Sequence, residues 1–395
     1  MTLPKGWEMK KVGEVCEIVN GGTPDTNIKE FWNGDLLWIS PKDLGKLNEI
    51  YVDETSRMIT QLGLKNSSAK LLPINSVILS SRAPIGHLAI NKKPMATNQG
   101  CKGLIPKNSL DALYLFHFLF FSKDHLNDLG IGATFKELSG SKLGTVEIPL
   151  PPLPEQHRIV TLLDKAFAAL AQAKTNLEQN LKNARHLFES YLQSVFENKG
   201  EDWEEKTVGE ISDHCLGKML DKAKNKGTNQ KYLRNQNVRW FEFDLTEVFE
   251  MPFTDNELEK YSARKGDLLI CEGGYPARAA IWDSDESIFF QKALHRVRFH
   301  KPNMNRWFLY FLSISDSNGY LKKHFTGTGI QHFTGQALDK MKIPIPQQNS
   351  IEALLTKFDF LSSHTQKLET LYRPKLAGLE EMKKAILQKA FSGQI

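Results

Sequence analysis

Two long stretches of the chain repeat apolar residues at the spacing of a coiled coil. The first runs from Pro154 to Phe196 without a further proline or any glycine, and its apolar and small residues recur at steps of three and four. This spacing predicts one narrow apolar stripe on an α-helix about 65 Å long, which needs a second helix to cover it. The stripe consists of Ile159, Leu163, Ala166, Leu170, Ala173, Leu177, Leu181, Ala184, Phe188, Tyr191 and Val195.

The second stretch begins at Pro346-Gln347-Gln348 and is the predicted partner of the first. Both stretches end alike, at Leu192–Phe196 and Leu387–Phe391. Pro374 is expected to kink the second helix or to break it into two, because proline lacks an N–H and collides with the preceding turn. Two independent amphipathic helices, each packed on its own domain, are the alternative. The second stripe consists of Ile351, Leu355, Phe358, Leu361, Leu368, Tyr372, Leu379, Met382, Ile386 and Ala390.

Each long helix follows one copy of an internal repeat of about 195 residues. Gly6-Trp7-Glu8 returns as Asp202-Trp203-Glu204, and Ile148-Pro149-Leu150-Pro151 returns as Ile343-Pro344-Ile345-Pro346. The repeat therefore predicts two globular domains that alternate with two helices. The expected boundaries are 1–153 for the first domain, 154–200 for the central helix, 201–345 for the second domain and 346–395 for the C-terminal helix.

The middles of the two copies, 20–105 and 216–300, share only a skeleton of similar residues. We expect the scaffold to be duplicated, whereas the surfaces that contact a ligand differ between the copies. The matched positions are Val77-Ile78 with Leu269-Ile270, Pro84 with Pro276, and Gln99 with Gln291.

Short runs of strand-forming residues between turn residues predict a mostly β body in each copy. The apolar segments Asp111–Phe121 and Arg306–Ile314 have helical length, and the aromatic residues of the first are expected to lie in the core rather than to stack on bases. The expected fold class is α+β: two tandem, mixed, mostly β domains with short helices, and two long paired helices. The predicted strands are 36–40, 76–80 and 87–90 in the first copy, and 267–271 and 279–282 in the second.

The composition fits a two-domain protein without a membrane segment. The 395 residues are 41% hydrophobic and 25% charged, and the longest apolar run, Leu113–Phe121, is too short to cross a bilayer. The N-terminus has no signal-peptide pattern, so a cytoplasmic location is expected. The four cysteines lie far apart and predict neither a zinc site nor a redox pair. A net charge of +5 is compatible with a polyanionic partner.

Motifs of catalysis are absent from the sequence. It contains no G-x-x-x-x-G-K-[ST] phosphate loop, no G-x-G-x-x-G fingerprint, no H-E-x-x-H and no G-x-S-x-G. It also lacks a tetrapeptide like the Asn-Pro-Pro-Tyr with which amino-methyltransferases hold a flipped base. We therefore expect no catalytic residue, no metal site and no cofactor in this chain.

The segment Gly217–Trp240 has the composition of a nucleic-acid-binding loop. It contains seven basic residues and one acid, Asp221, with amides and a tyrosine between them. Lys and Arg neutralise phosphates, whereas Asn, Gln and Arg carry the paired groups that read base edges. A solvated basic loop is the alternative. The DNA-binding candidates are Lys218, Lys222, Lys224, Lys226, Tyr232, Arg234, Asn235 and Asn237.

Two turns, 80–86 and 272–278, and the segments that follow them add further candidates. Glycine in such a turn lets the backbone approach a ligand closely. Arg82 and Arg278 are the leading candidates for DNA contact, and a structural ion pair is the alternative for each. The other candidates are Asn98, Gln99 and Lys102 in the first copy, and Gln291, Lys292 and His295 in the second.

Motifs spread over nearly the whole chain carry a family resemblance. They are Gly21-Gly22-Thr23-Pro24, Phe31-Trp32-Asn33-Gly34-Asp35, the run 148–156 that enters the first long helix, the run 267–274, and the ending Leu387–Gly393. With these motifs and its repeated layout, the sequence resembles the specificity subunits of Type I restriction–modification systems. It departs from the family's usual form at Pro374 and at the opening of the second helix, which lacks the Pro-x-x-Glu-Gln pattern.

The resemblance implies a subunit that selects the DNA sequence for an enzyme complex. Two target-recognition domains would each read one half of a bipartite double-stranded DNA site, and the long helices would pair antiparallel and fix the spacing. Two methyltransferase subunits would dock on this frame, and restriction subunits would join them. S-adenosylmethionine, ATP and Mg²⁺ would be used by those partners, while this chain would be non-catalytic and would not contact a membrane.

Two other functions stay open at this point. The chain could be a scaffold or tethering protein whose domains read no sequence, in which case DNA binding would show a steep salt dependence without sequence preference. It could also be a stand-alone nuclease or methyltransferase with unrecognised motifs, which activity of the purified chain with Mg²⁺ or a methyl donor would reveal.

Overall fold

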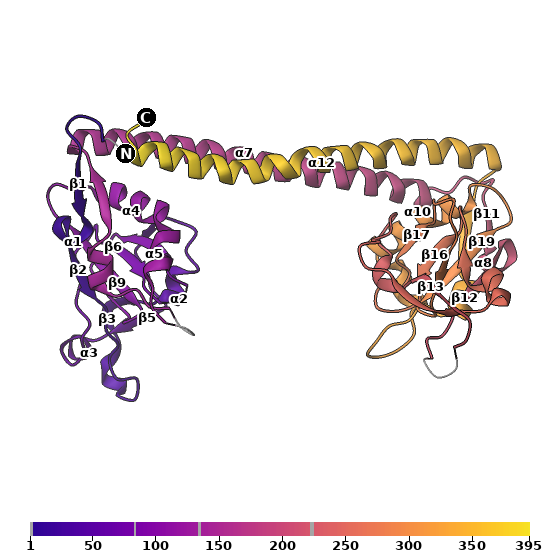
Figure 1. Ribbon diagram of the computed structural model, residues 1–395, viewed down its shortest axis with the longest axis horizontal. Coiled ribbons are helices and arrows are strands. Elements are labelled where there is room, and N and C mark those ends of the chain that lie inside the picture. Colours follow the sequence, from indigo (N-terminus) through magenta and orange to yellow (C-terminus); the bar gives the residue numbers. More distant parts are fainter. Residues whose placement is uncertain (1–2, 83, 133–135, 222–224) are drawn as a thin grey trace. The chain divides into compact units, whose positions relative to one another are not determined.

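The computed structural model describes residues 3–82, 84–132, 136–221 and 225–395. The chain divides into two compact units: unit 1 combines the chain up to Leu177 with Arg373–Ile395, and unit 2 is Glu178–Tyr372. Each unit contains one globular copy of the repeat and a stretch of both long helices (Figure 1). The fold class is α+β, as the sequence predicts.

Unit 1 is built on small sheets and short helices. Its elements are β1 (Glu8–Lys11), α1 (Val12–Val15), β2 (Cys16–Asn20), η1 (Lys29–Phe31), β3 (Trp32–Ile39), α2 (Pro41–Leu44), β4 (Tyr51–Val52), β5 (Arg57–Ile59), α3 (Gln61–Lys65), β6 (Val77–Ser80), β7 (Leu88–Asn91), β8 (Met95–Thr97), β9 (Cys101–Pro106), α4 (Ala112–Phe121), α5 (Lys123–Leu129), α6 (Gly140–Gly144) and β10 (Glu147–Leu150). The sheet orders are β2-β9-β6-β7-β4, β5-β3-β8 and β1-β10. The strands and the helix predicted for this copy are all present.

Unit 2 repeats this plan. Its elements are β11 (Glu204–Thr207), α8 (Val208–Ile211), β12 (Ser212–Leu216), β13 (Thr228–Leu233), η2 (Asn235–Asn237), β14 (Phe249–Phe253), η3 (Asp255–Glu257), α9 (Leu258–Tyr261), β15 (Ser262–Ala263), β16 (Leu268–Cys271), β17 (Ala279–Ile281), β18 (Ile288–Phe290), β19 (Leu294–Phe299), α10 (Met304–Ser317), η4 (Tyr320–His324), α11 (Gly335–Asp339) and β20 (Lys342–Ile345). The order β12-β19-β16-β17 matches β2-β9-β6-β7, and β13 pairs parallel with β18 as β3 does with β8.

The strand register corrects the alignment of the two middles by one residue. Val77 and Leu268 hold the same place in their antiparallel ladders. Both face the core clusters that contain α4 or α10, whereas Ile78 and Leu269 face the clusters on the other side of the sheet. Because neighbouring residues in a strand point to opposite faces, a one-residue slip would exchange the two cores. The corrected pairs are Val77 with Leu268, Pro84 with Tyr275, and Asn98 with Gln291.

The two long helices are α7 (Leu153–Glu197) and α12 (Gln348–Phe391). All stripe residues predicted for α7 are buried or half-buried, which confirms that stripe. In α12 the prediction is wrong at Met382, which is 54% exposed, while the next residue, Lys383, is half-buried. Pro374 does not break α12 into two helices. It lies at an exposed position, where water can satisfy the carbonyl that loses its helical N–H partner.

The long helices pair antiparallel within each unit (Figure 1). In unit 1 the ammonium of Lys174 lies 3.4 Å from the carboxylate of Glu380, and in unit 2 Nε of Arg185 lies 2.6 Å from that of Glu369. Residue numbers rise along one helix as they fall along the other. The alternative of two helices that pack only on their own domains is therefore wrong.

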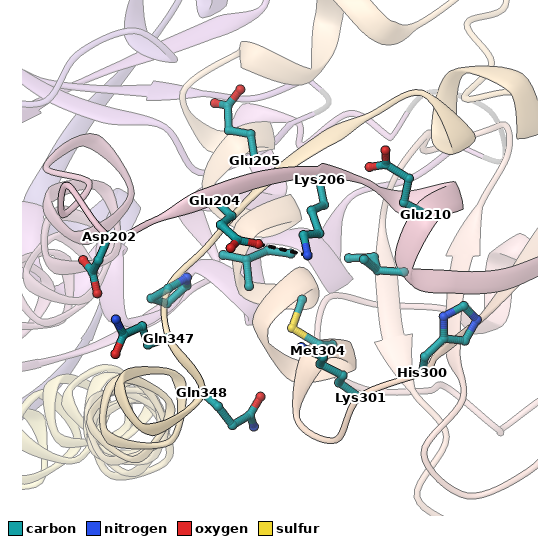
Figure 2. A pocket seen from close by; sticks show the side chains of 13 residues that line it. Asp202, Glu204, Glu205, Lys206, Glu210, His300, Lys301, Met304, Gln347 and Gln348 are labelled. Carbon is teal, nitrogen blue, oxygen red and sulfur yellow. Dashed lines mark ion pairs between the residues drawn. The ribbon is translucent and has the colours of Figure 1, made fainter.

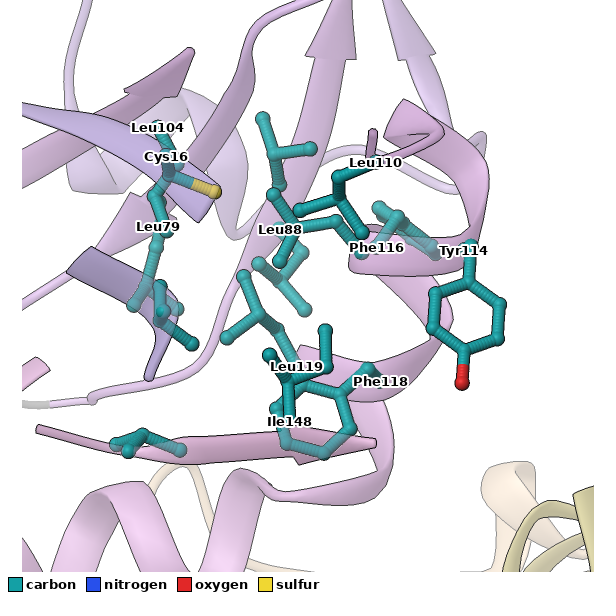
Figure 3. Packing of buried hydrophobic residues seen from close by; sticks show 14 of the residues in the cluster. Cys16, Leu79, Leu88, Leu104, Leu110, Tyr114, Phe116, Phe118, Leu119 and Ile148 are labelled. Carbon is teal, nitrogen blue, oxygen red and sulfur yellow. The ribbon is translucent and has the colours of Figure 1, made fainter. Parts of the chain in front are cut away.

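The ends of the long helices complete the core of each unit. Figure 3 shows the core of unit 1, to which Tyr114, Phe116 and Phe118 of α4 contribute, as predicted. The prediction is wrong for Phe120 and Phe121, which are 36% and 40% exposed and lie outside the core cluster. The helix residues in the two cores are Ile159, Val160, Leu163, Leu387, Ala390 and Phe391 in unit 1, and Leu192, Phe196, Ile351, Leu355 and Phe358 in unit 2.

Candidate nucleic-acid interface

Unit 2 has a polar cleft where η2 faces the turn between β16 and β17. Its volume is about 600 Å³. Three arginines and two carboxylates line it, so its net charge is positive. The lining residues are Arg234, Asn235, Gln236, Asn237, Arg239, Asp244, Thr246, Glu247, Gly274, Tyr275 and Arg278.

Two asparagines hold the walls of this cleft together. Asn237 is 3% exposed, and its Oδ1 accepts a hydrogen bond from the backbone N–H of Arg234 at 2.9 Å. Its Nδ2 donates to two carbonyls of the segment 244–247, at 2.9 and 2.8 Å. Asn235 Nδ2 donates to the carbonyl of Gly273 at 3.0 Å. Asn237 therefore positions the backbone with both amide hydrogens in use, while Asn235 joins the two walls.

The structure brings Arg234 and Arg278 to the same cleft. Nη2 of Arg278 donates to the carbonyl of Asn235 at 2.9 Å, and its guanidinium lies 4.2 Å from the ring centre of Tyr275. Arg234 forms an ion pair of 3.0 Å with Glu247. In the described structure, Nε of both arginines is buried and has no hydrogen-bond partner, so a ligand would meet each guanidinium through its other nitrogens. Planar donors of this kind suit a phosphate or the edge of a guanine.

The sequence interpretation missed Tyr275 and Arg239 as cleft residues. Tyr275 is 65% exposed and follows Gly273-Gly274, so an aromatic residue at a glycine turn was the available signal. Arg239 is one of the seven basic residues of the 217–240 segment. Only the hydrogen bonds that fold 234–247 back on itself place it in the cleft.

The rest of the basic segment does not form one continuous surface. Lys218 is 7% exposed, and its ammonium lies 2.7 Å from a glutamate carboxylate. Tyr232 is 3% exposed and belongs to an aromatic core cluster, whereas Lys226 is exposed. Lys222 and Lys224 lie outside the described residues. The segment is divided because β13 runs between β14 and β18, so that part of it is covered.

The candidates near β19 also differ in exposure. Gln291 is half-buried and Lys292 is exposed, in the turn that precedes the strand. His295 is 1% exposed, and its Nε2–H donates to the carbonyl of Phe333 at 2.9 Å. Burial lowers the pKa of His295, so its ring is neutral at pH 7.

In unit 1, two of the candidates form an amide cluster beside a glycine. Asn98 Nδ2 donates to the hydroxyl of Thr23 at 2.8 Å, and that hydroxyl donates to Oε1 of Gln99. A Cβ on Gly21 would lie 1.9 Å from the carbonyl oxygen of Asn98, so only glycine allows this close approach. Gln99 is exposed, which leaves its amide hydrogens accessible.

Arg82 and Lys102 lie near the carboxylate of Glu137. Nε of Arg82 is 3.1 Å from that carboxylate, and the two side chains are 46% and 43% exposed. The ion pair considered as the alternative for Arg82 is therefore present, yet half of the side chain stays open. Lys102 is only 6% exposed. In the corresponding turn of unit 2, Arg278 occupies the place of His87, so Arg82 and Arg278 are not equivalent positions.

A further cavity of unit 2, about 630 Å³ in volume, lies at the start of α12 (Figure 2). Glu204 and Lys206 form an ion pair of 2.9 Å beside it, and no predicted DNA-contact residue lines it. Nε2 of Gln348 has no hydrogen-bond partner in the described structure. Its counterpart in unit 1, Gln156, is fully buried and hydrogen-bonded at both ends of its amide.

The four cysteine thiols do not have the low pKa of reactive cysteines. All four cysteines are free, and burial raises the pKa of Cys16 and Cys101 to about 12 and that of Cys271 to about 11. Among the described residues, no three or more His, Cys, Asp or Glu side chains gather in a way that could hold a metal ion. No helix in that part of the chain combines the length and apolar character needed to span a membrane.

Two solved structures share this fold over the whole chain. One is a chain from work on the complex assembly and conformational transition of the type I R-M system, with a TM-score of 0.80, 19% identity and 100% coverage of both chains. The other is the HsdS subunit from Thermoanaerobacter tengcongensis, with a TM-score of 0.65, 19% identity, and coverage of 100% of this chain and 99% of that one. At this level of identity, the two structures show the fold alone.

Fold and site together define a duplicated α+β protein with paired helices and a separate polar surface on each copy. The family model of the Type I restriction modification DNA specificity domain matches residues 4–183 and 200–373. The chain belongs to this family.

Several curated relatives carry the name of specificity subunits. The MjaIX specificity subunit of Methanocaldococcus jannaschii is 38% identical over 226 residues, 53% of this chain and 52% of that protein. The EcoR124I/EcoR124II specificity subunit of Escherichia coli is 32% identical over 196 residues, 48% of each chain. These two matches span about half the length of the relatives. The EcoKI specificity subunit of Escherichia coli K12 is 21% identical over 422 aligned positions, covering 100% of this chain and 90% of that protein.

Proposed function

We propose that this chain is the DNA specificity subunit of a Type I restriction–modification complex, and that each unit reads one half of a bipartite DNA site. The duplication of one scaffold with unlike side chains at equivalent positions supports this most strongly. Asn98 corresponds to Gln291, and His87 corresponds to Arg278. Equivalent scaffolds can meet the DNA backbone in the same way, while different side chains select different bases.

The division of labour follows the domain boundaries expected from the sequence. We assign DNA reading to 1–153 and 201–345, and the spacing of the two half-sites to the helices 154–200 and 346–395. The helices also dock two methyltransferase subunits, and restriction subunits join that assembly. S-adenosylmethionine, ATP and Mg²⁺ belong to those partners, and this chain is not catalytic by itself. Because its partner is the DNA of the cell, it acts in the cytoplasm.

Affinity and selection come from different contacts in this proposal. Exposed lysines and arginines neutralise phosphates, which makes binding depend on salt concentration. The amide cluster of unit 1 and the cleft of unit 2 supply the groups that read bases. A scaffold without sequence reading would show the salt dependence but no preference for one duplex.

The experiment that tests this function is a domain exchange. Residues 201–345 are replaced by the equivalent domain of a relative with a known site, and the methylated sequence is mapped in cells that supply the methyltransferase partner. One half of the site should change, while the other half and the spacer stay the same. The reciprocal exchange of 1–153 is the control. A change in both halves after a single exchange would contradict the proposal.

A further inference from the structure

Unit 1 contains a polar cavity of about 620 Å³ over β2 and β9, beneath the start of α6. Lys102 on β9 lies opposite Asn20 on β2 in the antiparallel ladder. Most side chains around the cavity are polar and come from these two strands and from the segment 137–141. The lining residues are Ile18, Asn20, Lys102, Glu137, Ser139, Gly140 and Ser141.

Lys102 is the side chain of this cavity that lacks a partner. It is 6% exposed, and within the described part of the chain its ammonium has no hydrogen bond and no ion pair within 4 Å. Burial lowers the pKa of Lys102, and the negative charge of Glu137 partly offsets that effect. The ammonium is not one of the buried side-chain atoms that lack a partner, so it reaches the open cavity, where an anion can pair with it.

We infer that this cavity is a phosphate-binding site in which Lys102 is the cation and Asn20, Ser139 and Ser141 supply neutral hydrogen-bond donors. The hydroxyls of Ser139 and Ser141 are hydrogen-bonded to each other at 2.9 Å, so one of their two hydrogens stays available to the phosphate. If the proposed function holds, the phosphate is one of the DNA backbone. A free phosphate ion has the same chemistry, and the experiment below separates the two sources.

Glu137 and Arg82 set the strength of this site. The carboxylate of Glu137 repels an approaching anion, and Arg82 counters that repulsion with its ion pair of 3.1 Å. Replacing Glu137 by glutamine would remove the repulsion and free the guanidinium of Arg82. The site therefore predicts two opposite effects: loss of Lys102 weakens phosphate binding, and loss of the Glu137 charge strengthens it.

The equivalent position in unit 2 carries no cation. His295 takes the place of Lys102 in the ladder between β12 and β16. Its ring is 1% exposed and donates to the carbonyl of Phe333, so it is turned to the protein and neutral. The phosphate site thus belongs to unit 1, whereas three arginines of unit 2 line its own cleft.

The test compares Lys102→Met, Glu137→Gln and the matched control His295→Gln in the full chain with its methyltransferase partner. DNA affinity is measured on the specific duplex over a series of salt concentrations. K102M should weaken binding about tenfold and reduce the slope of log K against log salt by about one, without changing the methylated sequence. E137Q should tighten binding, and H295Q should leave the slope unchanged. Lys102→Arg keeps the positive charge, so its slope should equal that of the unchanged chain. This result would show that K102M acts through the lost charge and not through a loss of folding.

A second measurement uses inorganic phosphate and the free chain, followed by NMR of the lysine side chains. Phosphate binding that K102M abolishes, with an altered salt slope on DNA, supports a DNA phosphate. If K102M abolishes the binding of inorganic phosphate but leaves the salt slope on DNA unchanged, the cavity is a phosphate site whose ligand is a free phosphate ion. If neither phosphate binding nor the slope responds to K102M or E137Q, the inference is wrong, while specific DNA binding and the domain exchange still stand. If the chain binds no specific duplex, the proposed function fails. The titration with inorganic phosphate then still tests whether the cavity binds phosphate.

Discussion

The two units share the order of their strands but attach the long helices with different side chains. Unit 2 inserts Phe358 of α12 between Tyr310 and Trp307, with ring centres 5.0 and 5.9 Å away. Unit 1 has a small residue, Ala166, at the matching place on α7. Counted along the helices, the equivalent positions are Ile159, Leu163 and Ala166 in unit 1, and Ile351, Leu355 and Phe358 in unit 2. The strand ladder is the part that the duplication keeps, whereas each core is packed in its own way.

The polar surfaces differ even more than the cores. In unit 1 a half-exposed Arg82 pairs with Glu137 beside the buried Lys102. In unit 2 Arg278 occupies another position of the corresponding turn, and its guanidinium lies over the ring of an exposed tyrosine. Where the ladder gives Lys102 in unit 1, it gives a neutral His295 in unit 2. One backbone thus presents two chemically different surfaces, which the proposed reading of two unlike half-sites needs.

The largest expected effect concerns the aromatic attachment in unit 2. Phe358→Ala should lower the free energy of unfolding by about 3–5 kcal/mol, because it removes a fully buried ring and leaves a cavity. Phe360→Ala is the matched control on the same helix, since that ring is 59% exposed, and it should change stability by less than about 0.5 kcal/mol. Denaturant unfolding measures both. Equal effects of the two substitutions would mean that Phe358 does not attach α12 to unit 2.

The second comparison concerns the glutamine at the start of each long helix. Gln156 accepts from the backbone N–H of Asp111 at 2.8 Å and donates to two carbonyls at 2.9 and 2.8 Å. Gln156→Ala should cost about 2–3 kcal/mol, because it leaves buried backbone groups without partners. Gln348→Ala should cost less than about 0.5 kcal/mol, because the Nε2 of Gln348 has no partner to lose. A larger loss for Gln348→Ala than for Gln156→Ala, in denaturant unfolding of the full chain, would reverse this comparison.

The third prediction separates the two reading surfaces. Arg278→Ala should weaken specific DNA binding by about 1–3 kcal/mol and relax the choice of bases in one half-site only. Lys265→Ala is the control, because Lys265 is exposed, pairs with Asp285 and lies outside the cleft. Binding to duplexes with single base changes in each half-site gives the readout. If base preference relaxes in both halves, the cleft of unit 2 does not act on its own half-site.

The smallest effect is a pH dependence to which each unit contributes one buried histidine. Burial lowers the pKa of His117 in unit 1, against the opposing charge of Asp164, and lowers that of His295 in unit 2. Below the ordinary pKa of 6.5, the unfolded chain binds protons that the folded chain does not, so stability is full above 6.5 and falls as the pH drops. The loss is at most about 1.4 kcal/mol per pH unit for each ring.

Unfolding of His117→Gln and His295→Gln across about pH 7.5 to 5 checks this dependence. Each substitution should flatten the decline in stability, and the double variant should flatten it further. A decline as steep as that of the unchanged chain would show that other groups are responsible.

The sequence predicts the elements of this fold better than it predicts the exposure of the candidate residues. The stripe of α7 and the strands at 76–80 and 267–271 follow from local periodicity. Of the two outcomes expected at Pro374, a kink or a break, the break does not occur, because an exposed position of a long helix tolerates a proline. The prediction for Met382 was wrong because polar residues interrupt the apolar stripe of α12. The stripe therefore does not determine whether Met382 or its neighbour Lys383 faces the other helix.

The candidate residues were harder to place. Asn237 and Tyr232 have the residue types of base contacts, yet Asn237 holds two carbonyls and Tyr232 lies in an aromatic cluster. An asparagine or a tyrosine is the same residue type whether its side chain faces DNA or the core, so the sequence does not distinguish the two cases. The pairing of β13 with β14 and β18 decides this for Tyr232, and the hydrogen bonds that fold 234–247 back on itself decide it for Asn237.

The sequence by itself determined the duplication, the two long helices and the apolar faces of the strands, because helical and strand periodicity are written in neighbouring residues. The tertiary structure alone decided the register by which Lys102 corresponds to His295, and the position that each arginine takes within its turn. Register depends on hydrogen bonds between segments far apart in the chain, and a shift of one residue moves every side chain of a strand to the opposite face.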